Sequence, residues 1–501
     1  MKKLILLLLI ILFLIQQIVV LPGCATIIPP EGGPRDSLPP VLTKANPDDS
    51  SRNFTDKTIV LSFDEYVDAE NYQQEMIISP IPENMPTVTR KLSTITVKIR
   101  DTLEPNTTYS LNFGNTIKDV NEGNVLKNFT YIFSTGSYFD SLGFSGNVLL
   151  AETGGLDSTL TVMLHKTNID SAVVNDKPRY VAKLDSAGNF RFRNLPPDTF
   201  YLYVLKDESR SYRYMDKTQL FGFADSAVIV TSNTKPVTLY AYASKEEPAK
   251  KAPSASAGRS NRAADKRLKF STNLQGNQQD LLDKLVFTFE TPLKTFDSSK
   301  VHFTRDTTYT PITGYSWEKD STLKTVTLNY TWQEGVKYDI ILEKDFATDT
   351  LNQQLLKPDT ISFKTKERKD YGKLTIRFRN LDLTKNPVLL FVQNNEVKKS
   401  FPLTSTTFSQ TLFPPGEYNL RILNDENKNG VWDPGEFFEK RKQPELVKPV
   451  QRAINVKANL DTPFDIDVTA PAPRSNQTQN PNTPGRTNNN RPNNNRPNNR
   501  F

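Results

Sequence analysis

The feature that most constrains this chain is a pattern of short stretches in which apolar and polar residues alternate. Ile59, Leu61 and Phe63 occupy every second position of one such stretch. Side chains on a strand point alternately to the two faces of a sheet, so this spacing predicts antiparallel strands with one buried face. No long stretch has the period of a helix. The chain is therefore predicted to be all-β.

The same pattern recurs about 230 residues further along the chain. The sequence IVLSFD at 59–64 matches LVFTFE at 285–290, at an offset of 226 residues. Later matches drift by a few residues, as loop insertions produce. We name the two copies A1 (40–136) and A2 (268–366).

A second kind of unit follows each copy. The sequence LPPDTF at 195–200 matches FPPGEY at 413–418, at an offset of 218 residues. We name these units B1 (140–243) and B2 (370–468). The order A1, B1, A2, B2 predicts duplication of a two-domain unit. We expect a string of independently packed β-sandwiches.

Three further segments have compositions that do not support a packed core. Residues 24–39 are rich in Pro and Gly and form a predicted tether, and 244–267 are rich in Ala, Ser, Lys and Pro and form a predicted flexible linker. Residues 469–501 are rich in Asn, Pro and Arg, and this tail is predicted to be disordered.

The positive charge of the chain lies in these segments. The formal net charge is +7, from 63 basic and 56 acidic residues. Lys2 and Lys3 contribute +2, the tail contributes +5 from five Arg without an acid, and the linker contributes about +4. About −4 is left for the predicted domains. A nucleic-acid-binding domain carries its basic residues on a folded face, so nucleic acid is not an expected partner.

The composition also argues against most enzymes. One Cys and two His exclude a disulfide scaffold and a multi-thiolate metal site, and they leave little material for a catalytic triad. Asp64 and Glu65 are adjacent at a strand end and should point to opposite faces. His165 is predicted to face solvent on a strand. The tryptophans are predicted to lie in cores or at a hairpin corner; they are Trp317, Trp332 and Trp432.

The N-terminus predicts export and lipid attachment. Residues 1–23 have the basic start and short apolar run of a signal peptide. Leu21-Pro22-Gly23-Cys24 resembles a bacterial lipobox, which implies that Cys24 becomes the first mature residue and carries acyl chains such as palmitate. Three acyl chains would hold the protein on a membrane. The alternative is an uncleaved single-span anchor over residues 4–21. Ala25, and not Asp, follows Cys24, and by the same resemblance this favours the outer membrane. Whether the protein faces the periplasm or the cell surface is left open.

Two segments of A1 carry a family resemblance. LEPNTTYSL at 103–111 resembles the L-x-P-x-T-x-Y-x-L segment of bacterial Ig-like sandwiches, which implies that the hydroxyl of Tyr109 bonds to the backbone upstream. With the turn DVNEGN at 119–124, A1 resembles the S-layer SbsA-type bacterial Ig-like domain. Together with the lipobox, the chain resembles Ig-like lipoproteins of the Bacteroidota. B1 resembles transthyretin-like and carboxypeptidase-regulatory-like sandwiches. These families provide no catalytic residues to carry over.

One motif predicts a metal site. Residues 425–436 (DENKNGVWDPGE) match the calcium-loop pattern D-x-[DN]-x-[DN]-G-x5-E in full. The predicted calcium ligands are Asp425, Asn427, Asn429, the carbonyl of Val431, Asp433 and Glu436. The alternative is a turn whose Asx side chains cap its own backbone amides. The equivalent loop of B1 begins at Asp207, has Tyr212 where Gly430 stands in B2, and is not expected to bind metal.

These observations favour a non-catalytic, lipid-anchored cell-envelope protein that acts as a structural spacer or a protein-interaction scaffold. The membrane is the expected partner of the acyl chains, together with an envelope protein or glycan. The alternative function is a glycan-binding or adhesive surface module, which an exposed row of Trp and Tyr on A2 would favour.

Overall fold

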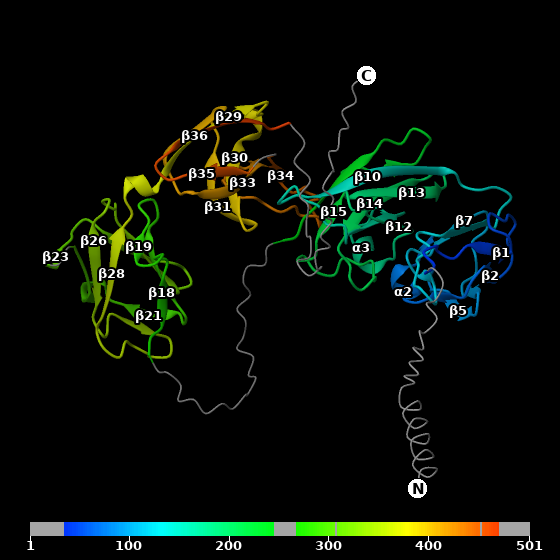
Figure 1. Cartoon of the computed structure of the whole chain (residues 1–501), viewed down its shortest axis with the longest axis horizontal. Coiled ribbons are helices and arrows are strands. Elements are labelled where there is room, and N and C mark those ends of the chain that lie inside the picture. The colour runs from blue at the N-terminus through cyan, green and yellow to red at the C-terminus, as the bar shows by residue number, and fades with distance from the viewer. Residues whose placement is uncertain (1–34, 245–266, 306–307, 451–452, 470–501) are drawn as a thin grey trace, which may run out of the picture.

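The computed structural model describes residues 35–244, 267–305, 308–450 and 453–469. Within these ranges the only α-helices are the single turns α2 (Tyr72–Glu75) and α3 (Ala172–Asn175), and nearly all other regular structure is strand. The prediction of an all-β chain of tandem sandwiches is confirmed. Figure 1 shows B1 and B2 side by side in the middle of the molecule, with A1 and A2 at opposite ends.

A1 is a sandwich of two main sheets that enclose one apolar core. The first sheet has the order β1 (Leu42–Asn46), β2 (Thr58–Phe63), β6 (Thr94–Lys98), β5 (Thr87–Lys91). The second has the order β4 (Ile77–Ser79), β7 (Thr108–Asn112), β9 (Thr130–Ser134), and β3 (Val67–Ala69) pairs with β8 (Ile117–Asp119). Ile59, Leu61 and Phe63 all lie in the core, as their alternation predicts.

A2 repeats this topology. Its first sheet has the order β18 (Phe270–Thr272), β20 (Leu285–Phe289), β25 (Thr325–Asn329), β24 (Ser316–Lys319). Its second has the order β19 (Gln278–Gln279), β28 (Asp359–Thr365), β26 (Lys337–Leu342), β22 (Val301–Arg305), β23 (Thr310–Pro311). The pair β21 (Leu293–Phe296) and β27 (Ala347–Asp349) corresponds to β3 and β8.

The tyrosine corner that the resemblance implied is present in A1. The Tyr109 hydroxyl accepts a hydrogen bond from the backbone N–H of Glu104 at 2.8 Å. In A2, the Tyr338 hydroxyl and the N–H of Gln333 stand in the same relation at 3.4 Å, although A2 lacks the Pro-containing segment. A threonine hydroxyl bonds each of the two corner carbonyls at 2.6 Å: Thr135 bonds Glu104, and Thr365 bonds Gln333. The two A units therefore share side-chain interactions as well as strand order.

The acidic residue that opens the DVNEGN turn of A1 shapes its backbone. The buried Asp119 carboxylate accepts hydrogen bonds from the N–H groups of Glu122, Gly123 and Asn124 at 2.6–2.9 Å. Burial raises the pKa of Asp119, but these hydrogen bonds outweigh burial and lower it below the ordinary value. Asp349 of A2 accepts from Leu351 and Gln353 in the same way.

B1 and B2 also share one topology. In B1 one sheet has the order β13 (Asn189–Leu195), β10 (Leu142–Leu150), β17 (Val237–Ala241). The other has the order β12 (Tyr180–Lys183), β11 (Thr161–His165), β14 (Thr199–Leu205), β15 (Phe221–Phe223), with β16 (Val228–Ile229) also paired to β14. In both B units the first strand pairs antiparallel on one side and parallel with the last strand on the other.

The corresponding sheets of B2 have the same connections. One has the order β32 (Thr407–Phe413), β29 (Gly372–Arg379), β36 (Asp461–Asp467). The other has the order β31 (Glu396–Pro402), β30 (Pro387–Gln393), β33 (Gly416–Asn424), β34 (Leu446–Pro449), with β35 (Ile454–Val456) also paired to β33. The chain between β33 and β34 is a long insertion, which begins with the predicted calcium loop.

The prediction of independently packed sandwiches is wrong for B1 and B2. Each encloses a core of its own, but a third apolar cluster joins the outer face of the β11–β14 sheet to the outer face of the β30–β33 sheet. B1 contributes Met163, Tyr203 and Phe221, among others, and B2 contributes Leu390 and Leu423. Burial of apolar surface from water holds the two units together.

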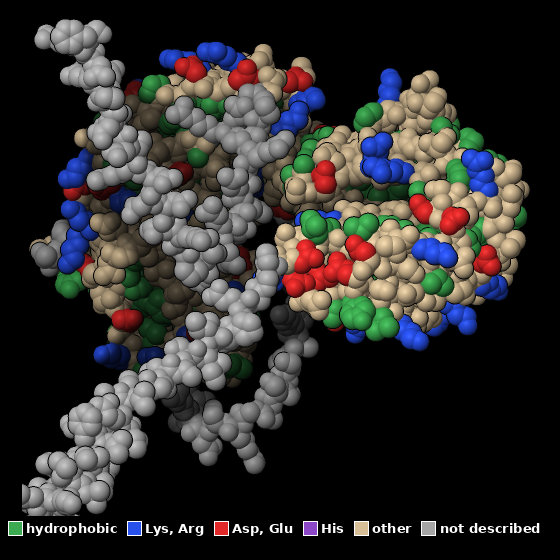
Figure 2. All heavy atoms as spheres, turned by 45° about the vertical axis from the view of Figure 1, so that its right-hand side comes forward, with side chains coloured by type: hydrophobic (Ala, Val, Ile, Leu, Met, Phe, Trp, Pro, Cys, Tyr) green, Lys and Arg blue, Asp and Glu red, His purple; other side chains and the backbone are tan. Residues whose placement is uncertain are grey.

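The outer surface is mixed in character. Figure 2 shows Lys and Arg interspersed with Asp and Glu over the face in view, with apolar side chains in small groups. Among the residues that the structure describes, no helix has the length and apolar character needed to cross a membrane. The predicted signal peptide and Cys24 lie outside the described residues, as does nearly all of the predicted linker and tail.

We predict that Tyr109→Phe weakens A1 alone. The substitution removes the hydrogen bond to the Glu104 N–H, and such bonds contribute about 1 kcal/mol to the free energy of unfolding. Hydrogen exchange read by mass spectrometry should show faster exchange across A1 and unchanged exchange in B2. Tyr66→Phe is the control, because the Tyr66 side chain is exposed. Equal exchange in Tyr109→Phe and wild type would contradict a stabilising corner.

Candidate functional site

The first half of the B2 insertion folds around the carboxylate of Asp425. This buried carboxylate accepts hydrogen bonds from the N–H groups of Asn429 at 3.2 Å and Gly430 at 2.7 Å. Gly430 has a φ of 77°, a left-handed conformation that glycine adopts without strain. The oxygen of Asn427 accepts from the Asn429 N–H, and the oxygen of Asn429 accepts from the Val431 N–H. These interactions form the Asx-capped turn.

Of the two remaining carboxylates predicted as ligands, one lies against the loop and the other does not. One oxygen of Asp433 accepts from the side-chain amides of Asn427 and Asn429 at 2.6 and 2.8 Å, which places Asp433 against the loop. Glu436 instead pairs with Lys440 at 2.8 Å and is half exposed. In the described part of the chain, no three His, Cys, Asp or Glu side chains converge as metal ligands would. Calcium binding by this loop stays a prediction.

Glu445 supports the loop, and sequence reasoning missed it. Its buried carboxylate accepts from the N–H groups of Glu426 at 2.8 Å and Asp433 at 3.0 Å, and its carbonyl accepts from the Trp432 indole at 2.7 Å. Burial raises the pKa of Glu445, and the charges of Asp433 and Asp425 raise it further. The two backbone hydrogen bonds lower it, but they do not outweigh these effects. Glu445 stands nine residues beyond the motif, so no spacing rule identifies it.

In the B1 copy of this loop, the first aspartate also accepts hydrogen bonds from backbone N–H groups of the loop. The Asp207 carboxylate accepts from the N–H groups of Ser209 and Tyr212 at 2.9 and 2.5 Å. Tyr212 has a φ of 55°, so it occupies the left-handed position that Gly430 takes in B2. The Arg210 guanidinium then reaches across to A1, where it donates to the carbonyls of Gln73 and Met76.

The second half of the B2 insertion attaches B2 to B1. The Arg441 guanidinium donates to one oxygen of Asp170 through two nitrogens, at 2.8 and 2.6 Å. The Gln443 amide donates to the carbonyl of Phe223 at 3.0 Å, and the Val447 N–H donates to the carbonyl of Ala151 at 2.9 Å. These polar interactions surround the shared apolar cluster.

Aromatic side chains make up the apolar part of this attachment. The Phe437 ring lies 5.1 Å from the rings of Phe221 and Phe223, and the Phe438 ring stacks on Tyr214 at 5.8 Å, measured between ring centroids. Aromatic pairs at these separations are favourable beyond the burial of their area. The insertion therefore links the predicted calcium loop directly to the B1–B2 contact.

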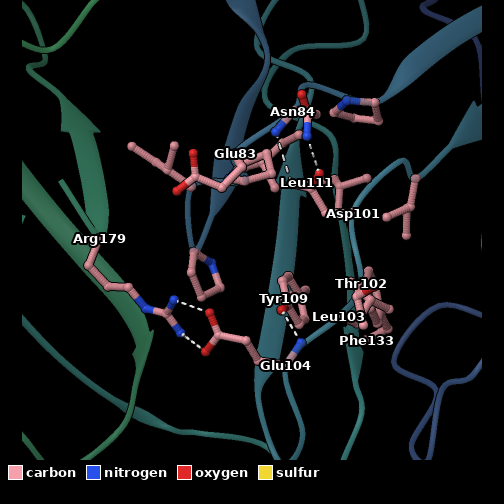
Figure 3. A pocket seen from close by; sticks show the side chains of 16 residues that line it. Glu83, Asn84, Asp101, Thr102, Leu103, Glu104, Tyr109, Leu111, Phe133 and Arg179 are labelled. Atoms are coloured by element: carbon pink, nitrogen blue, oxygen red, sulfur yellow. Dashed lines mark hydrogen bonds and ion pairs between the residues drawn. The ribbon is translucent and has the colours of Figure 1, made fainter. Parts of the chain in front are cut away.

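A pocket of about 420 Å³ lies where A1 meets B1 (Figure 3). Apolar side chains of A1 line much of it, including Ile81, Leu103 and Phe133. At one side Glu104 forms a two-point ion pair with Arg179 of B1, and the Arg179 carbonyl accepts from the Ile81 N–H at 2.9 Å. The same Glu104 supplies the N–H of the tyrosine corner. These contacts fix the joint between A1 and B1, and they engage both terminal nitrogens of Arg179, whereas its buried Nε has no hydrogen-bond partner.

The structure corrects the sequence prediction for His165. It is 2% exposed, not solvent-facing, and its Nε2 has no hydrogen-bond partner. It lies on the same face of β11 as Met163, which belongs to the B1–B2 cluster, and its ring makes an edge contact with Tyr203 at 5.4 Å. Burial lowers its pKa to about 4, with the charge of Asp176 opposing.

The other sequence candidates are structural. Trp332 and Trp432 are buried, and Trp317 is half-buried against Phe287 and Phe296, as predicted for core or corner residues. Trp332 and Trp432 are too buried to present an open ring to a glycan. Asp64 accepts a hydrogen bond from the Val41 N–H at 2.8 Å, a backbone role. Cys24 lies outside the described residues.

We predict that His165 makes the protein less stable in mild acid. Its pKa is about 4 in the folded protein and 6.5 in an unfolded chain, so the unfolded state binds more protons between these values. Stability therefore falls as the pH drops from 6.5 towards 4, by on the order of 3 kcal/mol in total. Thermal melts across this range should show wild type losing stability relative to His165→Phe as the pH falls, because the variant lacks this group.

His302→Gln is the matched control, since His302 is half exposed and pairs with Glu343. It should retain the loss of stability between pH 6.5 and 4, because His165 is unchanged in this variant. Parallel profiles of His165→Phe and wild type would contradict a buried neutral histidine.

Comparison with known protein families finds a match in A1. The family described as bacterial Ig-like domain matches residues 36–135. No curated protein matches the chain. Residues 36–135 are thus similar to bacterial Ig-like domains, in agreement with the sandwich and tyrosine corner described above.

Similar solved structures are distant. A native alpha-2-macroglobulin fragment of Escherichia coli is 14% identical, with 39% of this chain and 79% of that one covered and a TM-score of 0.18. The major pilin subunit BcpA of Bacillus cereus is 10% identical, with 65% and 98% covered and a TM-score of 0.16. The N-terminal part of the bacterial S-layer protein SbsC is 16% identical, with 41% and 45% covered and a TM-score of 0.15. Scores this low carry no argument about function.

Proposed function

We propose that this protein is a non-catalytic, lipid-anchored component of the bacterial cell envelope, and that it works as a structural spacer or protein-interaction scaffold. The observation that carries the proposal is the B1–B2 contact, because it joins the first half of the chain to the second. An extended body fixed at one end can hold surfaces at a distance from a membrane. The lipobox-like sequence at Cys24 would supply the fixed end, in the outer membrane and on its periplasmic or outer side.

The buried acidic residues support a non-catalytic role. Asp119 and Asp349 cap loops, and Asp68 pairs with Arg90 at 3.0 Å. Asp339 accepts from the Ser362 hydroxyl, and Glu445 accepts from backbone N–H groups. Each of these acids has a partner that explains its burial. A general acid or base instead needs an ionisable group directed at a substrate site.

We predict that Cys24→Ser releases the protein from membranes. Without the thiol, the acyl chains have no attachment atom, and the mature domains have little else to hold them. The mature protein should move to the soluble fraction after carbonate washing, whereas Ala25→Ser, the matched control, should stay with the membranes. Continued tight retention of Cys24→Ser would favour the single-span anchor over residues 4–21.

We further propose that the loop 425–436 binds calcium. The side-chain oxygens of Asp425, Asn427 and Asn429 all accept hydrogen bonds from backbone N–H groups of the same short loop. Asp433 is also held against this loop, by the side-chain amide of Asn429. Calcium takes six to eight hard oxygen ligands at flexible geometry. Glu436 would have to leave Lys440 and turn inward to complete the set. Calcium would also offset the charges of Asp433 and Asp425, which add to the effect of burial in raising the pKa of Glu445.

Glu436→Gln gives a sharp test of calcium binding. In the absence of calcium this side chain pairs with Lys440 on the surface, so the variant should melt like the wild type in chelator. Calcium should raise the melting temperature of the wild type and not that of Glu436→Gln. Thr218→Gln, at the twelfth position of the B1 loop, should keep the wild-type response. Identical melting of wild type in calcium and in chelator would remove the metal proposal.

A further inference from the structure

A groove of about 1900 Å³ separates A1 from B1. One wall is the outer face of the β4–β7–β9 sheet of A1, which presents Ser79, Ser110 and Thr130. The other wall is B1, where β12 and β13 both line the groove. Sites for small molecules measure roughly 300–1000 Å³. The size and polar lining of this groove suit a chain-like ligand better.

Among the described residues, β13 is the end strand of its sheet and forms a ladder with β10 alone, while β12 and β7 lie close to it without pairing. In an end strand, alternate residues direct their N–H and C=O groups away from the sheet. Such an edge can accept an extended peptide as an additional strand. The seven residues of β13 span about 23 Å, enough for a peptide of similar length.

The groove is lined by three acidic and three basic side chains, and they differ in which of them have partners. Its acidic side chains already have partners: Glu75 pairs with Lys183 at 2.9 Å, and Asp185 accepts from the N–H groups of its own turn. Asp140 is buried and accepts weakly from the Thr108 N–H. Arg191 and Arg193 are both exposed on β13, two residues apart and so on one face. Neither has an ion-pair partner among the described residues.

We propose that this groove binds an extended acidic segment of another protein, which adds to the edge of β13. The backbone of the segment forms the strand ladder, and acidic side chains at alternate positions lie opposite Arg191 and Arg193 as cross-strand pairs. The linker and the tail of this chain have the wrong charge for the role. The linker is basic, and the tail has five Arg and no acid.

The experiment uses the full chain with Cys24→Ser and a labelled, end-blocked peptide of alternating Thr and Glu, ten residues long. Fluorescence anisotropy should show saturable binding. Arg191→Glu with Arg193→Glu should weaken binding at least tenfold, since both cross-strand pairs become repulsive. The same variant should instead bind the matching Thr/Lys peptide. This gain of binding shows that the variant is folded.

Two controls separate strand addition from general attraction. Lys44→Glu with Lys98→Glu makes the same change in net charge on the first sheet of A1, away from the groove, and should leave binding unchanged. A peptide with Pro in place of alternate Thr keeps its charge but lacks N–H donors, and it should bind at least tenfold more weakly.

Three results would overturn the proposal. Absence of binding would mean that the two arginines only protect a strand edge from aggregation. Equal binding of the Pro-containing peptide would leave electrostatic attraction without strand addition. Displacement of the peptide by a neutral oligosaccharide, or dimerisation of the protein through the groove in sedimentation measurements, would assign the groove to a different occupant.

Discussion

The structure depends on one interaction, the packing of B1 against B2 through the outer faces of two sheets. A sheet in a simple sandwich buries one face, but the β11–β14 and β30–β33 sheets bury both. Every residue of β30 from Pro387 to Val392 is buried. Without this contact the two halves of the chain would be joined only by the segment between them. With it, the two A units lie at opposite ends of a single body (Figure 1).

The B2 insertion places two features side by side. Its first half closes on Asp425 and Glu445, and its second half carries Phe437 and Arg441 onto B1. A well-ordered first half of the insertion therefore helps to hold the second half in position against B1. If the loop binds calcium, the ion would stabilise the part of B2 that holds the two halves together, which is a structural role consistent with a spacer.

Local sequence predicted the parts of the fold that depend on local patterns. Alternating residues identified the A strands, and the Tyr109 segment identified the corner, because both follow from periodicity and turn chemistry. The B1–B2 contact was missed, although the unbroken apolar run of β30 is typical of a strand buried on both faces. His165 was misplaced for the same reason, since alternation alone assumes that one face meets solvent. Glu445 and the groove beside β13 depend on residues brought together from distant segments, and no local pattern identifies them.

Cleavage between the halves tests the central claim most directly. A protease site can be placed within residues 245–266, in the full chain with Cys24→Ser, and cut after folding. Size-exclusion chromatography should then show A1–B1 and A2–B2 eluting together, and Phe437→Asp with Arg441→Asp should separate them. Separation of the wild-type halves at micromolar concentration would contradict the account, because it would mean that B1 and B2 pack independently.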